Sequence, residues 1–460
     1  MGTTLIIDTL LTVTMDDELG DIKNGWVLVK DGKIDSVGDG SYPIADKTIN
    51  AFGMILLPGF INTHHHMFQT LTRNIPGTQN AHLFDWLRIL YEVWGELSEE
   101  AIYVSAQVAA AELILSGCTT SSDHLYLFPS KASNKFIDKE IEAVKSLGLR
   151  FHPTRGSMSL GRSSGGLPPD HIVQTEEEII DDSIRLIEKY HDADPHSMLR
   201  ISLAPCSPFS VTENLMQKSR EMADKYKVRL HTHLAETLEE EKYCLDIHGL
   251  RPLELLESLG WLGEDVWLAH TVHLNDKEIQ KLADTKTGVS HCPTSNMRLG
   301  SGIAPIAKML DAGVKISIAV DGSASNDSSN MLSELRQALL VPRLRDDRWL
   351  SAREIIRMST VGGAEILGRD DIGVIKKGAS ADLILFDLTD ISYAGAKSDP
   401  LAALLFCSGD QRVSWSMVNG KIIVENGKLL DVDLAAISIR ADKISEEMIR
   451  RSKNKITKTS

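Results

Sequence analysis

The chain has 460 residues, of which 42% are hydrophobic and 25% are charged. This is the composition of an ordinary globular protein, and it excludes a disordered or fibrous chain. The 49 Lys and Arg residues against 64 Asp and Glu residues give a formal charge of −15, which argues against nucleic acid as a partner because phosphate binding needs a basic surface.

Cysteine usage and hydropathy predict a cytoplasmic protein without a membrane partner. Five cysteines are scattered along the chain without a Cys-x-x-Cys pair. We therefore expect no disulfide framework and a reducing compartment. No run reaches the ~18 apolar residues that a membrane span needs. The apolar N-terminal run is interrupted by Asp8 and lacks a basic region, which favours a strand over a signal peptide.

Both ends of the chain carry the pattern of short strands joined by tight turns. Asp31-Gly32 separates two β-rich segments and is a strong hairpin signal. Asn-Gly pairs at 419–420 and 426–427 repeat that signal near the C-terminus. We therefore predict one small β-sandwich domain that combines residues 1–55 with residues 371–430.

Between these ends, short apolar runs alternate with long amphipathic stretches. The segment 212–227, for example, has helical periodicity and is followed by the apolar run VRLHTHLAE. Repeated strand-then-helix order indicates a parallel sheet covered by helices. The sequence predicts an α/β fold, a TIM-like (β/α)8 barrel over residues 56–370, and then a C-terminal helix with a basic tail over residues 431–460.

Three consecutive histidines follow the first apolar run of this central region, in LLPGFINTHHHMFQ. Alternate side chains of a strand share one face, so His64 and His66 point together and His65 points away. Two imidazoles on one face at the end of a strand make half of a metal site. The alternative is a polar strand end with three ordinary histidines.

A second histidine pair ends another predicted strand, in VRLHTHLAET. His233 is expected at the carboxyl end of the strand, where barrel active sites lie. His231 is expected to point the same way, one layer deeper in the barrel, and to be a hydrogen-bonded core histidine. Glu236 stands at the mouth, within reach of a bound substrate, although a solvated glutamate at a helix start is the alternative.

Two further motifs, VWLAHTVHL with His270 and SIAVDGSASND with Asp321, complete the set. Asp321 follows an apolar run directly, and its alternative role is a helix N-cap. If His66 ends the first strand and Asp321 the eighth, seven βα units average about 36 residues, the pitch of such a barrel. Three histidines and an aspartate then meet at one rim, a ligand set that suits catalytic zinc, which lowers the pKa of bound water to ~7.

These four motifs resemble the amidohydrolase superfamily, in the branch that holds triazine hydrolases, S-adenosylhomocysteine-type deaminases and 8-oxoguanine deaminases. The resemblance implies one divalent metal, Zn²⁺ or else Fe²⁺ or Mn²⁺, held by His64, His66, His233 and Asp321. It further implies that His270 orients the attacking water and that Glu236 shuttles protons. Our hypothesis for the reaction adds that Asp321 passes a proton to the leaving group. The predicted fourth strand, LRISLAPCSP, has no lysine for a two-metal site.

The finer resemblance is to the 8-oxoguanine deaminases, through GCTTSSDHLYLFP, TRGSMSLGRSSGGLPPD and VDGSASNDSSNML. Candidate substrate contacts are Gln69 to a purine edge, Trp86 by ring stacking or else packing on the barrel, and Arg155 to a ring carbonyl or else a neighbouring carboxylate. The Gly- and Pro-rich segment 156–169 is expected to be a mobile cover of the active site, or simply a surface loop.

The resulting hypothesis is hydrolytic deamination of 8-oxoguanine to urate and ammonia, with hydroxide generated at the metal. Alternatives within the same class are loss of an alkylamino group from a hydroxytriazine and deamination of a pterin or an adenosine derivative. A metal-free scaffold is the alternative from another class. The resemblance also suggests a homo-oligomer.

Overall fold

The structure, a computed structural model, describes residues 2–130, 134–407 and 411–459, and the side chains of the last range only to Lys453. Its centre is a sheet of eight parallel strands that follow one another in chain order. These strands are β7 (Phe60–Asn62), β9 (Cys118–Leu125), β10 (Arg150–Ser157), β11 (Ser202–Pro205), β12 (Leu230–Leu234), β13 (Val266–His270), β14 (Gly288–His291) and β15 (Ile316–Ile318).

The sheet closes into a barrel through two short continuations of its outermost strands. β8 (His65–His66) continues β7, and β16 (Asp321–Gly322) continues β15. The two pair in parallel, with Asp321 opposite His65. The predicted (β/α)8 barrel is therefore confirmed, and its seam lies at the residues that were expected to bind metal.

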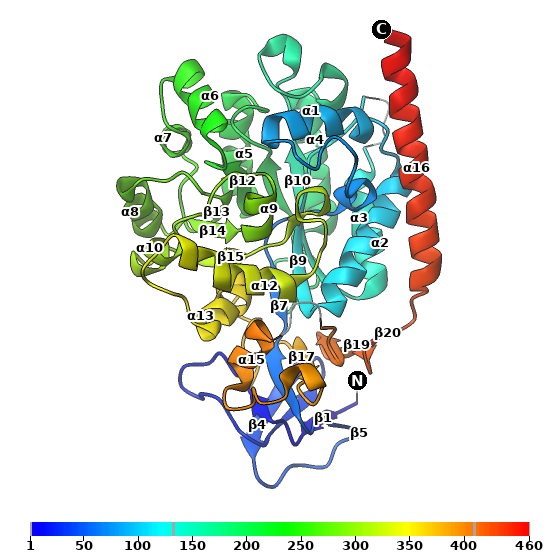
Figure 1. Cartoon of the computed structure of the whole chain (residues 1–460), viewed down its shortest axis with the longest axis vertical. Coiled ribbons are helices and arrows are strands. Elements are labelled where there is room, and N and C mark those ends of the chain that lie inside the picture. The colour runs from blue at the N-terminus through cyan, green and yellow to red at the C-terminus, as the bar shows by residue number, and fades with distance from the viewer. Residues whose placement is uncertain (1, 131–133, 408–410, 460) are drawn as a thin grey trace.

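Helices surround the barrel (Figure 1) and begin where the sequence offers side-chain caps. Thr212 caps α5 by accepting from the Leu215 N–H, and Thr175 with Glu178 forms a capping box on α4. The main helices of the wall are α2 (Glu99–Leu115), α3 (Phe136–Leu147), α4 (Glu176–Tyr190), α5 (Glu213–Tyr226), α6 (Leu238–His248), α7 (Pro252–Ser258), α8 (Asp276–Thr285), α10 (Ile306–Asp311), α12 (Met331–Leu340) and α13 (Ala352–Arg357). None of the helices in the described ranges combines the length and apolar character needed to cross a bilayer.

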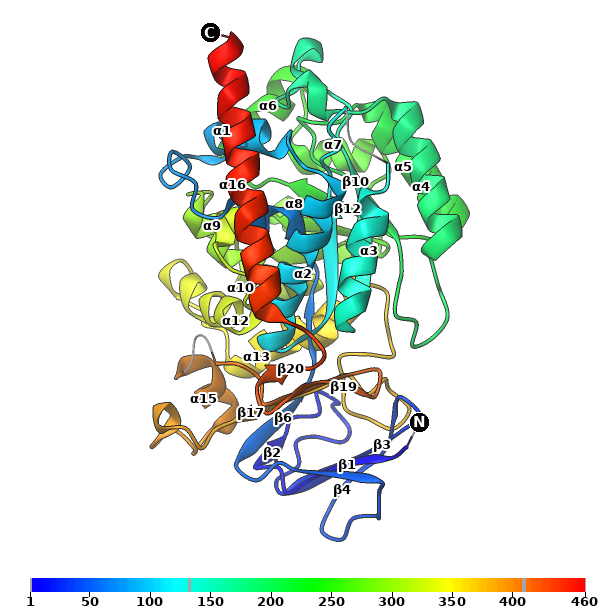
Figure 2. The ribbon, with the colours of Figure 1, turned by 90° about the vertical axis from the view of Figure 1, so that its right-hand side faces the viewer.

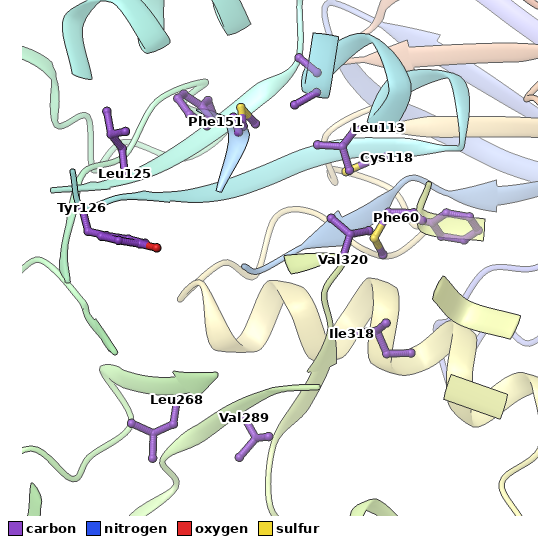
Figure 3. Close-up of a cluster of buried hydrophobic side chains, with 14 of the residues drawn as sticks. Phe60, Leu113, Cys118, Leu125, Tyr126, Phe151, Leu268, Val289, Ile318 and Val320 are labelled. Carbon is purple, nitrogen blue, oxygen red and sulfur yellow. The ribbon is translucent and has the colours of Figure 1, made fainter. Parts of the chain in front are cut away.

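The barrel core is apolar near the β-sandwich and polar near the opposite rim. Figure 3 shows buried side chains of this core from several strands, among them Phe60, Cys118, Phe151 and Leu268. Beyond them, the rim holds buried histidines and carboxylates. Buried ionisable groups are costly unless they are paired or hydrogen-bonded.

Both ends of the chain build the β-sandwich beneath the barrel (Figure 1). One sheet consists of β1 (Thr4–Ile7), β3 (Gly25–Lys30), β4 (Lys33–Asp39) and β5 (Lys47–Asn50), and the other of β2 (Leu11–Thr12), β6 (Met54–Pro58), β17 (Leu383–Asp387), β18 (Trp415–Val418), β19 (Lys421–Glu425) and β20 (Lys428–Leu429). Ile6 and Val27 of the first sheet share an apolar cluster with Leu56 and Leu385 of the second. The predicted β-sandwich is thus confirmed as a packed pair of sheets.

Two features join the sandwich to the barrel. β6 runs directly into β7 through Gly59, where a Cβ atom would lie 1.9 Å from Thr119 Oγ1, so only glycine fits this corner. The buried Arg150 of β10 binds Asp382 with two hydrogen bonds of 2.9 and 3.0 Å. The sandwich is therefore anchored at the end of the barrel opposite the polar rim.

The last helix, α16 (Leu434–Thr459), runs along the outside of α2 (Figure 2). Ser445 Oγ donates to the Leu71 carbonyl at 2.6 Å, in the short helix that directly follows the three histidines (Met67–Thr72). The helix predicted for the C-terminus is present, whereas the side chains of its expected basic tail beyond Lys453 lie outside the described residues.

Candidate metal centre and its cavity

Five side chains meet at the rim because each lies at or just beyond the carboxyl end of a barrel strand. They are His64, His66, His233, His270 and Asp321, and all except the partly exposed His233 are buried. His270 and Asp321 adopt φ angles of 71° and 60°, a left-handed conformation that costs about 1–2 kcal/mol for residues other than glycine. Backbone strain of this kind concentrates at functional sites.

Four of these side chains place ligand atoms at the spacing of a small cation's coordination shell. His66 Nε2 lies 3.1 Å from His233 Nε2, and Asp321 Oδ1 lies 3.2 Å from His64 Nε2 and 3.3 Å from His66 Nε2. Zinc bonds of ~2.0–2.1 Å in a tetrahedron put ligand atoms about 3.3 Å apart. The distances therefore match a zinc-sized ion.

Hydrogen bonds to carbonyl groups set the tautomer of two of the histidines. His66 Nδ1 lies 2.7 Å from the His124 carbonyl, and His233 Nδ1 lies 2.7 Å from the Cys206 carbonyl. A carbonyl can only accept, so each Nδ1 carries the proton and each Nε2 presents a lone pair. Two lone pairs 3.1 Å apart repel each other unless a cation lies between them.

His64 reaches the same state through another imidazole. Its Nδ1 lies 2.7 Å from His231 Nε2, and His231 Nδ1 lies 2.9 Å from the Trp267 carbonyl. His231 must donate to that carbonyl, so its Nε2 accepts and His64 Nδ1 donates. His64 Nε2 is then a buried lone pair without a hydrogen-bond partner among the described residues. Burial also lowers the pKa of His64 well below its ordinary value, which keeps the ring neutral.

His270 differs from these ligands in its partners. Its Nδ1 lies 2.9 Å from Asn296 Oδ1, and its Nε2 lies 3.6 Å from Glu236 Oε2 and 3.9 Å from Asp321 Oδ2. Burial alone would lower the pKa of His270, but the two carboxylates outweigh it and raise the pKa. This ring is placed to hold or move a proton between two carboxyl groups.

Glu236 is fixed at the cavity wall by the start of α6. The side chain of Glu240 accepts the backbone N–H groups of Ala235 and Glu236 at 2.8 and 3.0 Å, so the turn after β12 has one defined shape. Ser301 Oγ donates to Glu236 Oε1 at 3.2 Å. Burial raises the pKa of Glu236, which suits a carboxyl group that delivers a proton.

A cavity opens above these side chains, with about 440 Å³ of empty space when the open solvent at its mouth is included. Its floor is His66, His233, Glu236, His270 and Asp321. Its opposite wall is one face of α1 (Leu83–Trp94), and its sides include Gln69, Tyr126, Cys206, Ser207, Phe209, Leu299 and Ser325. The reactive groups therefore face a largely apolar pocket. Burial raises the pKa of Cys206 to about 12, so this thiol is no nucleophile at neutral pH.

Two of the three predicted substrate contacts, Gln69 and Trp86, line this cavity. Gln69 Oε1 already accepts from the Ala324 N–H at 3.3 Å. Its side chain passes so close to Gly322 that a Cβ atom there would lie 2.0 Å from Oε1. The glycine after Asp321 therefore makes room for Gln69.

Arg155 requires a correction. It is buried against α4, where its Nε donates to Asp182 Oδ2 at 2.6 Å and its guanidinium lies 3.9 Å over the Phe128 ring. It is not among the described residues that line the cavity. The structure therefore shows the alternative role, in which Arg155 binds a neighbouring carboxylate, and we no longer count Arg155 as a candidate substrate contact. In the segment 156–169, the Leu167 N–H donates to the Phe209 carbonyl at 3.3 Å. The role of this segment as a mobile cover stays a prediction.

Several residues of the site were not predicted from the sequence. His124, at the end of β9, orients His66 through its carbonyl. Asn296, in α9 (Pro293–Arg298), binds His270. The end of β9 was visible as DHLYLF after the run GCTTSS and could have identified His124. No local signal identifies Asn296, because its role depends on where α9 lies relative to β13.

Known proteins are similar to this chain along most of their length. The model of the Amidohydrolase family matches residues 55–423. The chain is 48% identical to the 8-oxoguanine deaminase of Pseudomonas aeruginosa over 420 residues, which are 90% of this chain and 93% of that protein. It is 36% identical to the hydroxydechloroatrazine ethylaminohydrolase of Pseudomonas sp. strain ADP, over 98% and 96% of the two chains.

Solved structures agree with this assignment. The atrazine chlorohydrolase of Arthrobacter aurescens TC1, solved in complex with zinc, superposes with a TM-score of 0.92 at 35% identity, over 96% of this chain and 100% of that chain. The scaffold alternative finds no support, because a suitable side chain stands at each predicted ligand position. The chain is an enzyme, a hydrolase, and it belongs to the amidohydrolase family.

Proposed function

We propose that this enzyme hydrolyses the exocyclic amino group of 8-oxoguanine and releases urate and ammonia. The observation that carries the proposal is the 48% identity with an 8-oxoguanine deaminase over 90% of the chain. The convergence of Glu236, His270 and Asp321 on one cavity supports it, since deamination of a ring amidine needs a proton donor beside a nucleophilic water. The expected cytoplasmic location and homo-oligomeric state remain predictions.

We further propose that His64, His66, His233 and Asp321 hold one divalent cation, with zinc the first candidate. The lone pairs that face one another at 3.1–3.3 Å support this assignment. Such an ion, when bound, lowers the pKa of a coordinated water and makes hydroxide available at neutral pH. The chain itself contributes the fixed tautomers and the proton-transfer groups.

The positions of Glu236, His270 and Asp321 support the following order of proton transfers. Water adds its oxygen to the amidine carbon while Glu236 delivers a proton to the adjacent ring nitrogen. The proton that water loses passes by way of His270 and Asp321 to the exocyclic amine, and the C–N bond breaks. Glu236 recovers a proton from the new hydroxyl group as the C=O bond forms and ammonia leaves. General acid–base help of this kind is worth ~10²–10⁴-fold.

A substrate panel tests the proposal. We expect the zinc-loaded enzyme to release ammonia from 8-oxoguanine with a kcat/KM at least tenfold above that for a pterin, an adenosine derivative or a hydroxytriazine. The hydroxytriazine is the second candidate, because of the 36% identity with an ethylaminohydrolase of that class. Preferential release of ethylamine from N-ethylaminohydroxytriazine would overturn the proposed substrate.

A further inference from the structure

Glu334, in the first turn of α12, is a buried carboxyl group behind the rim. It is 1% exposed and is not one of the described residues that line the cavity. Its Oε1 accepts the Thr294 N–H at 3.0 Å, and its Oε2 accepts Asn326 Nδ2 at 2.8 Å. Thr294 lies in α9, and Asn326 ends α11 (Ser323–Asn326). One carboxylate therefore joins two separate segments of the rim.

The contact with Thr294 holds the start of α9. Within the described structure, the residue before this helix, Cys292, provides no side-chain cap, so the N–H groups of the first turn need another acceptor. Glu334 supplies it, and a carboxylate at this end of a helix is favoured by the helix dipole. The same helix carries Asn296, whose Oδ1 accepts the His270 Nδ1–H at 2.9 Å. α9 thus links Glu334 to His270.

The contact with Asn326 holds the peptide group before Asp321. Asn326 Nδ2 donates to the Val320 carbonyl at 2.6 Å as well as to Glu334. Asp321 has the strained φ of 60°, and such a conformation persists only where the surrounding structure holds it. The hydrogen bonds of Asn326 are part of that surrounding structure, so Glu334 is also linked to Asp321.

A serine pair connects the two segments directly. Ser295 Oγ of α9 donates to Ser325 Oγ of α11 at 3.0 Å, and Ser325 Oγ lies 3.3 Å from Asp321 Oδ2. A shift of either segment is therefore transmitted to the carboxylate of Asp321. Glu334 binds both segments on the side away from the cavity.

We propose that Glu334 is a positioning residue, which holds His270 and Asp321 in the relative placement that proton transfer requires. This inference rests on the proposed function, in which these two groups pass a proton to the leaving amine. His270 Nε2 and Asp321 Oδ2 lie 3.9 Å apart, and a misplacement of ~1 Å costs a catalytic site about 10²-fold in rate. Glu334 acts through Thr294 and Asn326, so its effect is on placement and not on the proton itself.

Glu334→Gln is the variant that tests this role, because glutamine keeps the size of the side chain and one acceptor. Its Nε2 cannot accept from Asn326 Nδ2, and Asn326 cannot turn its amide because Nδ2 also serves the Val320 carbonyl. E334Q therefore keeps the contact with Thr294 or the contact with Asn326, but not both.

Glu278→Gln is the matched control. Glu278 is also buried, lies in the first turn of α8, and accepts a backbone N–H, that of Asn275, at 2.8 Å. It pairs with Arg251 and, in the described part of the chain, does not line the cavity. E278Q therefore measures what the loss of a buried carboxylate costs in stability alone.

Three measurements separate placement from folding: the melting temperature, the kinetics of ammonia release from 8-oxoguanine per bound zinc, and the visible spectrum of cobalt(II)-loaded protein. Kinetics at pH 8.5 keep Glu334 ionised in the wild type, since burial raises its pKa to about 7. We expect both variants to melt below wild type. E334Q alone should lose about 10- to 100-fold in kcat, with KM within about threefold, and alone should change the cobalt absorption, because Asp321 is a proposed ligand.

Wild-type kcat per zinc in E334Q, an equal loss in E278Q, or an unchanged cobalt spectrum overturns the proposal. If E334Q does not fold, Asn326→Ala breaks the second contact alone and should give the same loss of kcat and the same spectral change, and wild-type values there overturn it as well. Failure of the proposed function is distinct: wild-type enzyme would then release no ammonia from 8-oxoguanine, while the cobalt spectra, which need no substrate, still test Glu334.

Discussion

His231 supports His64 through a direct imidazole–imidazole hydrogen bond of 2.7 Å. His231 is itself fixed by the Trp267 carbonyl and lies stacked on the Trp267 ring, with 4.5 Å between ring centroids. The pair therefore decides which nitrogen of His64 faces the proposed cation. Partners of this kind raise the basicity of a ligand and hold its ring in place.

Replacing His231 with Phe is expected to weaken zinc binding by about 10- to 100-fold, because the His64 ring loses the acceptor that fixes its tautomer. Competition with a fluorescent chelator measures the zinc dissociation constant directly. His291→Phe is the control, since His291 is a buried histidine whose ring nitrogens have no hydrogen-bond partner in the described residues. Equal zinc affinity in the two variants would show that His231 is only a core residue.

Replacing Glu236 with Gln is expected to lower kcat by about 10²–10⁴-fold while zinc content stays near one equivalent. Gln preserves the size and the contact with Ser301 but cannot cycle a proton. Ammonia release and metal analysis on the same preparation give both quantities. The exposed neighbour Glu239 provides the control variant Glu239→Gln. Activity above about a tenth of wild type, with zinc retained, would remove Glu236 from the mechanism.

A buried pair of carboxyl groups, Asp123 and Glu140, predicts a pH-dependent stability. Burial raises the pKa of Asp123 to about 7 and raises that of Glu140 well above its ordinary value, and Asp123 Oδ1 also accepts the Met67 N–H at 2.7 Å. The folded protein therefore keeps protons that the unfolded chain releases above pH ~4. Stability consequently falls as pH rises above about 4, by up to about 1.4 kcal/mol per pH unit for each proton that is kept.

Glu140→Gln tests this linkage because its amide can donate to Asp123 without a titrating proton. We expect the melting temperature of E140Q, relative to wild type, to increase steadily between pH 5 and pH 7.5. Differential scanning fluorimetry at matched zinc content measures the difference at each pH. Parallel curves for the two proteins would mean that the pair holds no extra proton.

The Arg150–Asp382 pair predicts a large effect far from the site. Asp382→Ala leaves the Arg150 guanidinium buried without its carboxylate and is expected to cost about 3–5 kcal/mol in the free energy of unfolding. Asp85→Ala, which removes an exposed pair with Arg88, should cost less than about 1 kcal/mol. Urea denaturation compares the two, and similar midpoints would contradict the anchoring role of Arg150.

Local sequence signals predicted the elements whose geometry is set by neighbouring residues. Asp31 and Gly32 take φ angles of 50° and 81° at the predicted hairpin, and Asn419 and Gly420 take 48° and 78°, as turns of this kind require. The alternation of strands and helices likewise indicated the barrel. The period of two along a strand placed His64 and His66 on one side.

Features that depend on barrel closure were not predictable in this way. β10 is buried along its entire length, so no alternation of apolar and polar residues indicated whether Arg155 points into the barrel or toward α4. The expected contact between Arg155 and the substrate is therefore not found. The identity of the partner of His231 depends on which strands lie across the barrel from each other. The position of α1 over the cavity follows from packing and not from any local motif.

The pairing of β6 with β17 has a consequence for biosynthesis. One edge of β6 meets β2 as soon as both leave the ribosome, but the other edge waits for Leu383, which pairs with Pro58 about 325 residues later. At ~5–20 residues per second this takes roughly 16–65 s. The residues proposed to bind metal are all translated before Leu383 appears. The nascent chain can therefore complete its barrel while β6 still exposes an open edge, and an open edge is prone to pair with other chains until β17 covers it.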